Sequence, residues 1–174
     1  MTKQPIPGTV FEIKGIHYGY HQDVTTGPDG KAVLTAVPVD SYEVKETSVP
    51  DPYVVGGETI QTIYLGPGDD QNLVFENLKM PRLTVTKIDA EDSKPIPGTV
   101  FTVEGIDSDF SADWTTGADG TVTDRVAPGS YKITEKSVPA PYYLPSKNAD
   151  REQTVSLNAG DEVNVTFRNR KMPR

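Results

Sequence analysis

Leu83-Thr84-Val85-Thr86-Lys87-Ile88-Asp89 has the alternating pattern of a β-strand. Side chains point alternately to the two faces of a strand, so Leu83, Val85 and Lys87 share one face. Burying an unpaired ammonium beside apolar residues costs several kcal/mol, or forces the amine to lose its proton. The pattern therefore predicts that other strands supply partners for Lys87.

Two later strand patterns also end an apolar face with one polar residue. The inward face of residues 131–135 ends in Glu135, and that of residues 163–169 ends in Asn169. Since all three faces are apolar up to this last position, we expect the three polar groups to meet at one end of a β-sandwich core.

An amine, a carboxylic acid and a carboxamide held together can react. The neutral amine of Lys87 can attack the side-chain carbonyl of Asn169 while protonated Glu135 polarises that carbonyl and shuttles protons. Ammonia then leaves and a Lys-Asn isopeptide bond remains. Burial favours the neutral forms that this reaction needs. The alternative is a buried salt bridge beside an amide, or three polar strand ends that reach solvent.

An internal repeat divides the chain. Pro5-Ile6-Pro7-Gly8-Thr9-Val10-Phe11 recurs at residues 95–101, an offset of 95 − 5 = 90. Later matching segments have offsets of 89 to 92. We therefore expect two tandem domains: a first repeat over residues 1–81 and a second, complete repeat over residues 82–174.

The first repeat keeps the acid and the amide. Glu46 corresponds to Glu135 (135 − 46 = 89), and Asn77 corresponds to Asn169 (169 − 77 = 92). An offset of 90 maps Lys87 to a position before the first residue. We therefore expect the first repeat to lack its first strand, and with it the lysine partner of Glu46 and Asn77.

Lys3 does not replace that strand. It aligns with Ser93, directly before the Pro-Ile-Pro turn, and is too close to the next strand to form a full first strand. We expect one intramolecular bond in the whole chain and an open first repeat. Its free edge would accept a lysine-bearing strand in trans.

Composition favours an all-β protein and excludes several partners. The 174 residues include 15 Gly and 15 Pro, with no Cys and a net charge of −8. Nucleic acid is an improbable partner because clustered Lys and Arg are lacking, and no disulfide can form. No apolar run is long enough for a membrane span, and no signal peptide follows Met1. We expect a piece of a longer protein.

No enzyme site, metal site or cofactor is indicated. His17 and His21 have no counterparts in the second repeat, so a loop or edge position explains them better than metal binding. Acidic residues, including Asp89, lack the regular spacing of a calcium loop and are expected in solvated turns. Trp114 is expected in the core. The predicted chemistry happens once, on the protein itself.

The ordered motifs resemble the collagen-adhesin B-type (Cna B-type) domain of Gram-positive surface adhesins and pilins. They are L-T-V-T-K-I-D at residues 83–89, S-Y-K-I-T-E-K-S-V-P-A-P-Y at residues 130–142 and V-T-F-R-N-R-K at residues 165–171. The resemblance implies tandem Ig-like or prealbumin-like β-sandwiches. It also implies that Lys87 and Asn169 are cross-linked and that Glu135 is the catalytic acid.

By this resemblance, the chain is a structural stalk module of a cell-wall-anchored, extracellular adhesin or pilin, with neighbouring repeats of the same protein as partners. The alternative is a ligand-binding module that recognises a host matrix protein or glycan through its loops. Candidate loops are residues 16–23 and 139–147.

Overall fold

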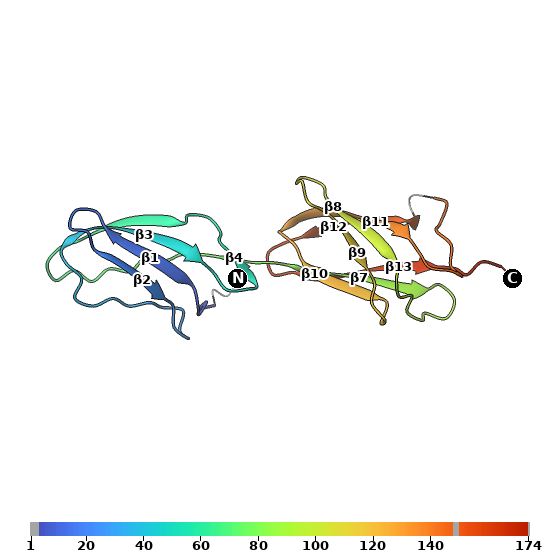
Figure 1. Cartoon of the computed structure of the whole chain (residues 1–174), viewed down its shortest axis with the longest axis horizontal. Coiled ribbons are helices and arrows are strands. Elements are labelled where there is room, and N and C mark those ends of the chain that lie inside the picture. Colours follow the sequence, from blue (N-terminus) through green and yellow to red (C-terminus); the bar gives the residue numbers. More distant parts are fainter. Residues whose placement is uncertain (1–3, 148–149, 174) are drawn as a thin grey trace. The chain divides into compact units, whose positions relative to one another are not determined.

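The computed structural model describes residues 4–147 and 150–173, so Lys3 lies outside the described residues. Strands provide the regular structure of these ranges, which contain no α-helix, and the predicted all-β class is confirmed (Figure 1). The chain divides into unit one, Met1–Lys79, and unit two, Met80–Arg174.

Unit two is a sandwich of seven strands, which confirms the predicted fold. The strands are β7 (Arg82–Asp89), β8 (Val100–Gly105), β9 (Ser111–Thr115), β10 (Thr121–Arg125), β11 (Gly129–Ser137), β12 (Glu152–Leu157) and β13 (Glu162–Asn169). One sheet has the order β12-β11-β8-β9 and the other has the order β10-β7-β13. The strand patterns at residues 83–89, 131–135 and 163–169 lie within β7, β11 and β13.

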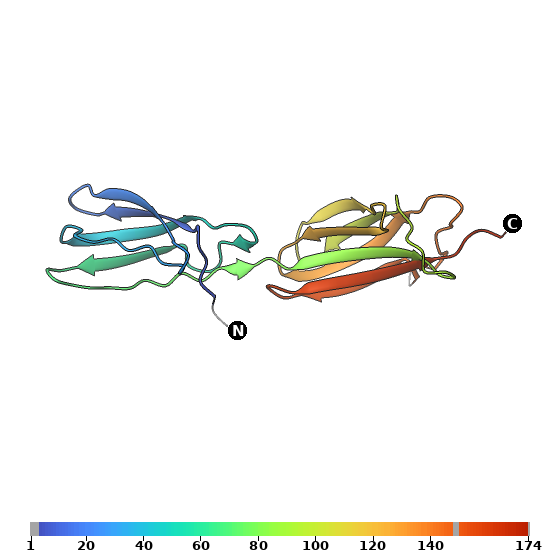
Figure 2. The same cartoon turned by 90° about the horizontal axis from the view of Figure 1, so that it is seen from below.

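Strand β7 is the central strand of its sheet. It pairs antiparallel with β10 and parallel with β13, and Figure 2 shows β7 and β13 side by side. The parallel register places Lys87 opposite Phe167 and Asp89 opposite Asn169. The first and last strands of unit two are therefore direct neighbours that run in the same direction.

The core of unit two lies between its two sheets. Leu83 and Val85 of β7 are fully buried, as the alternation of residues 83–89 predicts. The rings of Phe101 and Phe167 lie 4.8 Å apart across the core. Trp114 is only 7% exposed, so its predicted core position is confirmed. Burying such side chains supplies most of the favourable free energy of folding.

Unit one repeats one sheet of unit two. Its strands are β1 (Val10–Gly15), β2 (His21–Thr25), β3 (Asp40–Ser48), β4 (Tyr53–Val54), β5 (Ile60–Leu65) and β6 (Leu78–Lys79). The sheet order β2-β1-β3-β5 is the counterpart of β9-β8-β11-β12. Strand β4 pairs with β6 alone.

Residues 4–79 of unit one form no counterpart of the sheet β10-β7-β13. Residues 31–35 and 70–77 correspond to β10 and β13 by the repeat offsets, but neither segment is assigned as a strand. In unit two these strands pair with β7, which lies between them. Residues 4–79 contain no counterpart of β7, so the two segments lack the neighbour with which a strand forms hydrogen bonds.

Candidate functional site

Three polar side chains lie together inside unit two. Lys87 comes from β7, Glu135 from β11 and Asn169 from β13, so the cluster joins the two sheets. Lys87 and Glu135 are fully buried, and Asn169 is 2% exposed. Strand alternation directs each of them to the core, because each is in phase with the buried apolar residues of its own strand. The sequence predicts this cluster, and the structure brings all three residues together.

The contacts within the cluster are short. The Lys87 Nζ lies 2.6 Å from Asn169 Oδ1 and 2.9 Å from Glu135 Oε1. The Asn169 Nδ2 donates to the same Glu135 oxygen at 2.6 Å, and to the Tyr143 carbonyl at 3.0 Å. Glu135 Oε1 thus contacts both the amine and the amide nitrogen. Among the described residues, its Oε2 is buried without a hydrogen-bond partner.

Burial favours the neutral form of the Lys87 amine. Removal from water lowers the pKa of Lys87 below its ordinary value, and this effect outweighs the hydrogen bond and charge of Glu135, which act in the opposite direction. The amine also lies 5.9 Å from the centre of the Phe167 ring. A lower pKa increases the fraction of neutral amine, which is the nucleophilic form.

The cluster contains every group that amide exchange requires. The Lys87 amine lies against the Asn169 amide, and the Glu135 carboxyl contacts the amide nitrogen that would leave. Because the fold holds the amine against the amide, the two groups need not meet by diffusion, and the free-energy barrier to their reaction is lower. The arrangement can therefore support one acyl transfer in which all reacting groups belong to this chain.

Asp89 corrects one expectation from the sequence, because it is fully buried rather than in a solvated turn. Its Oδ2 lies 2.7 Å from Lys171 Nζ and accepts a 3.0 Å hydrogen bond from the Tyr142 hydroxyl. The Glu91 amide donates to its other oxygen at 2.8 Å. The strand alternation contained the signal, since Asp89 is in phase with Lys87.

The contacts of Asp89 predict that unit two loses stability in acid. The Lys171 ammonium and the Glu91 amide hold the pKa of Asp89 at about 2, below its ordinary value of 3.8. A carboxyl whose pKa is lower in the folded state stabilises that state above its unfolded pKa, and this stabilisation is lost as pH falls through the folded pKa. We therefore expect Asp89→Asn to lower the melting temperature at neutral pH and to flatten its decline between about pH 4 and pH 2.

Thermal unfolding followed by Trp114 fluorescence as a function of pH tests this prediction, because Trp114 is the chain's single tryptophan and lies in unit two. Asp107→Asn, an exposed carboxyl of the same unit, is the matched control and should leave the pH profile unchanged. An Asp89→Asn protein with an unaltered acid profile would contradict the prediction.

Unit one contains two of the three polar groups in the same arrangement. The Asn77 Nδ2 donates to Glu46 Oε1 at 2.7 Å, and Glu46 is only 4% exposed. The Glu46 Oε2 is buried without a partner among the described residues, as in unit two. The Phe11 and Phe75 rings lie 4.8 Å apart, which repeats the ring pair of unit two. The acid and the amide of unit one therefore have the same mutual arrangement as Glu135 and Asn169 in unit two.

The two histidines of unit one contact different carboxylates. The His17 Nδ1 lies 2.6 Å from buried Asp40, whereas the His21 Nε2 lies 3.2 Å from Glu12 on the exposed side of β1 and β2. Glu12, His21 and Asp23 could each offer one ligand atom within 4.8 Å of the others. Exposed acidic groups commonly cluster in this way, so the loop and edge interpretation is retained.

Comparison with solved structures identifies similar folds in the Bacillus anthracis TIE protein and in a shaft pilin. The Bacillus anthracis TIE protein is 24% identical with a TM-score of 0.51, over 98% of this chain and 32% of its own. A double-mutant form of the shaft pilin SpaA from Lactobacillus rhamnosus GG is 14% identical with a TM-score of 0.57, over 98% and 87%. A streptococcal ancillary pilin is 18% identical with a TM-score of 0.47, over 97% and 59%.

The TM-scores of the TIE protein and the shaft pilin show a shared fold, and the chain spans about a third of the TIE protein structure. No curated protein gives a significant match. Among the described residues, no helix meets the length and hydropathy of a membrane span. The family model of the SpaA prealbumin-like fold domain matches residues 1–79 and again residues 81–171. The chain therefore belongs to the family of SpaA-type prealbumin-like fold domains, in two copies.

Proposed function

We propose that this chain is a structural stalk module of a Gram-positive surface adhesin or pilin, and that an isopeptide bond between Lys87 and Asn169 closes unit two. Membership of the SpaA-type family supports the stalk assignment. The observation that carries the cross-link is the buried contact of 2.6 Å between Lys87 Nζ and Asn169 Oδ1, with Glu135 against both groups.

The reaction balances within the three side chains. The neutral Lys87 amine attacks the Asn169 Cγ while the Glu135 carboxyl gives a proton to the carbonyl oxygen. A proton from the amine passes through Glu135 to the Asn169 nitrogen. The C–N bond to that nitrogen then breaks, ammonia leaves, and the oxygen returns its proton to Glu135 as the carbonyl re-forms. The products are one secondary amide and one ammonia, and Glu135 regains its starting protonation. Glu135 is thus the catalytic acid of a single turnover.

A bond at this place suits a stalk because it joins the first and last strands of unit two. Strands β7 and β13 are parallel neighbours, and Lys87 and Asn169 lie near the same end of this pair. Hydrogen bonds alone would let a pull on the two ends separate these strands. We accordingly place the chain outside the cell, within a longer, cell-wall-anchored protein whose neighbouring repeats are its partners.

Intact mass under denaturing conditions tests the cross-link. We expect the protein to be lighter than its sequence mass by one ammonia, and Lys87→Ala, Asn169→Ala and Glu135→Ala each to restore the full mass. Lys132→Arg, which changes an exposed lysine on β11, is the matched control and should keep the deficit. A full sequence mass in the unaltered protein would refute the cross-link.

A further inference from the structure

A second group of polar side chains lies directly beyond the proposed cross-link. Asp89 follows Lys87 by two residues on β7. Lys171 follows Asn169 by two residues, just after the end of β13. Asp89 is fully buried, and its Oδ2 lies 2.7 Å from the Lys171 Nζ. This ion pair therefore joins the same two parts of the chain as the cross-link, two residues further along each.

The chain after β13 is also paired with the loop that follows β11. Tyr142 and Lys171 lie opposite each other in an antiparallel β-bridge, and the Met172 amide donates to the Pro141 carbonyl at 2.8 Å. The Tyr142 hydroxyl donates to Asp89 Oδ2 at 3.0 Å. Asp89 therefore contacts the side chains of both bridged residues and holds the loop to the chain after β13.

This pairing brings a backbone carbonyl to the reacting amide. Tyr143 directly follows the bridged Tyr142, and its carbonyl accepts a 3.0 Å hydrogen bond from the Asn169 Nδ2. The same nitrogen donates to Glu135 Oε1 at 2.6 Å. A side-chain amide nitrogen carries two hydrogens, so both are used. The amide oxygen is left facing the Lys87 Nζ, at 2.6 Å.

The Tyr143 carbonyl distinguishes between the two orientations of this amide. A protonated carboxyl can donate or accept, so Glu135 can contact either end of the amide. A backbone carbonyl can only accept, and an amide turned over would place its oxygen against the carbonyl oxygen with no hydrogen between them. The orientation matters because the nitrogen must face Glu135 to receive the proton with which it leaves.

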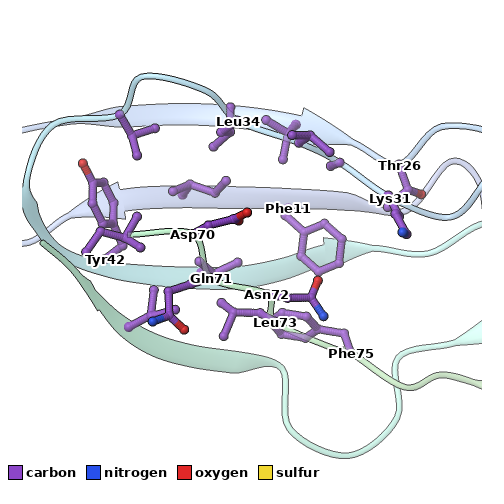
Figure 3. Close-up of a pocket in the computed structure, with 18 of the residues that line it drawn as sticks. Phe11, Thr26, Lys31, Leu34, Tyr42, Asp70, Gln71, Asn72, Leu73 and Phe75 are labelled. Atoms are coloured by element: carbon purple, nitrogen blue, oxygen red, sulfur yellow. The ribbon is translucent and has the colours of Figure 1, made fainter. Parts of the chain in front are cut away.

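Unit one has the bridge without the ion pair. Tyr53 and Lys79 are the counterparts of the bridged residues and lie opposite each other in the β4–β6 pair. Residues 4–79 have no counterpart of β7 to bring a carboxylate to Lys79, and Figure 3 shows the groove of about 510 Å³ that is open in its place. In the described part of this unit, the Asn77 Nδ2 donates to Glu46 and has no backbone carbonyl as a second acceptor. The ion pair and the second hydrogen bond thus occur together, in unit two.

We propose that Asp89 and Lys171 are positioning residues for the reaction of Asn169. Their ion pair holds residues 141–143 against the chain after β13, and the Tyr143 carbonyl in turn holds the amide with its nitrogen toward the acid. Asp89 and Lys171 act through this carbonyl rather than on the reacting atoms. The inference rests on the proposed function, since it adds two residues to the reaction proposed there.

The rate of ammonia loss tests this assignment. The whole chain is made by cell-free translation, translation is stopped, and samples are taken into denaturant over time for measurement of intact mass. Asp89→Asn and Lys171→Met should each slow the loss about tenfold or more, because small displacements of reacting groups are costly in rate. The double variant should be no slower than the slower single variant, because either change releases the same loop. Lys171→Arg keeps the charge and should react at nearly the unaltered rate.

Two controls separate positioning from stability. Lys94→Met removes an exposed ion pair with Asp92, 2.9 Å long and in the loop after β7, and should leave the rate unchanged. Val126→Ala removes buried volume near the start of β7, where the Val126 amide donates to the Pro81 carbonyl. It should lower the melting temperature without slowing the reaction of the folded protein.

Nitrogen-15 NMR of the Lys87→Met protein reads the amide directly, because this variant cannot react and keeps the Asn169 side chain. Both side-chain amide hydrogens should be protected from exchange with solvent. Adding Lys171→Met should speed the exchange of the hydrogen that the Tyr143 carbonyl accepts, about tenfold or more, and leave the hydrogen donated to Glu135 protected.

The outcomes separate this inference from the proposed function. Unaltered rates in Asp89→Asn and Lys171→Met would overturn the positioning role and leave the cross-link standing. Equal slowing by Val126→Ala would also overturn it, because the ion pair would then act through stability alone. No ammonia loss in the unaltered protein would overturn the proposed function itself, and the positioning role with it.

Discussion

Glu135→Ala is expected to cause the largest loss of stability of any single substitution in unit two. It prevents the cross-link, whose span of 169 − 87 = 82 residues restricts the unfolded chain by about 4.5 kcal/mol on the loop-entropy model. It also leaves the buried Lys87 amine without its carboxyl partner, and a buried polar group that loses its partner costs about 1 to 3 kcal/mol. Together these losses are comparable to the whole stability of many domains.

Denaturant unfolding followed by Trp114 fluorescence measures this loss, because the single tryptophan reports on unit two alone. The double variant Lys87→Met, Glu135→Gln removes the cross-link, the buried amine and the buried acid together, so its loss should be near the cross-link contribution only. Glu46→Ala changes the corresponding acid of unit one and should leave the Trp114 transition in place. A Glu135→Ala protein that unfolds at the unaltered denaturant concentration would contradict the proposal.

The second large effect concerns extension under force. A pull on the two ends of unit two enters along β7 and leaves along β13, and the proposed bond connects these strands at Lys87 and Asn169. The intervening residues then lie outside the path of the load and cannot be drawn out. Without the bond, the separation of 169 − 87 = 82 positions adds up to about 280 Å at roughly 3.4 Å per position.

Single-molecule stretching should therefore show no step of this length in the unaltered protein and a step of this length in Lys87→Arg. The arginine keeps the positive charge but cannot form the amide, so the comparison isolates the covalent bond. Lys132→Arg serves as the matched exposed control and should behave like the unaltered protein. Full extension of the unaltered unit two in most molecules would refute a covalent bond between β7 and β13.

Period-two alternation is sufficient to predict much of unit two. It assigns faces to the strands that contain Lys87, Glu135 and Asn169, so their meeting in the core follows from sequence. The relative direction of the strands cannot be predicted from this alternation, because the parallel pairing of β7 with β13 depends on contacts between residues about 80 positions apart. Asp89 was misassigned to a turn because acidic residues suggest solvent, although its phase matches the buried positions.

Unit one shows more clearly that local sequence alternation alone does not determine where a strand forms. Residues 70–77 have the same alternation as β13, with Leu73, Phe75 and Asn77 in one phase, yet they form no paired strand. A strand exists only when a neighbour accepts its backbone hydrogen bonds, and no such neighbour occurs among residues 4–79. Sequence periodicity therefore predicts which segments can form a strand. Whether a segment does form one depends on a neighbouring strand that pairs with it.

The parallel pairing of β7 with β13 also determines when during folding the proposed bond can form. Lys87 and Asn169 are separated by 82 residues and meet only when these distant strands pair, which is a slow event because of the loop it closes. Ammonia release would then occur only in molecules that had completed their sandwich. Since denaturation does not break an amide, each chain would keep a permanent chemical record of having folded once, and its later refolding would start from a tied loop.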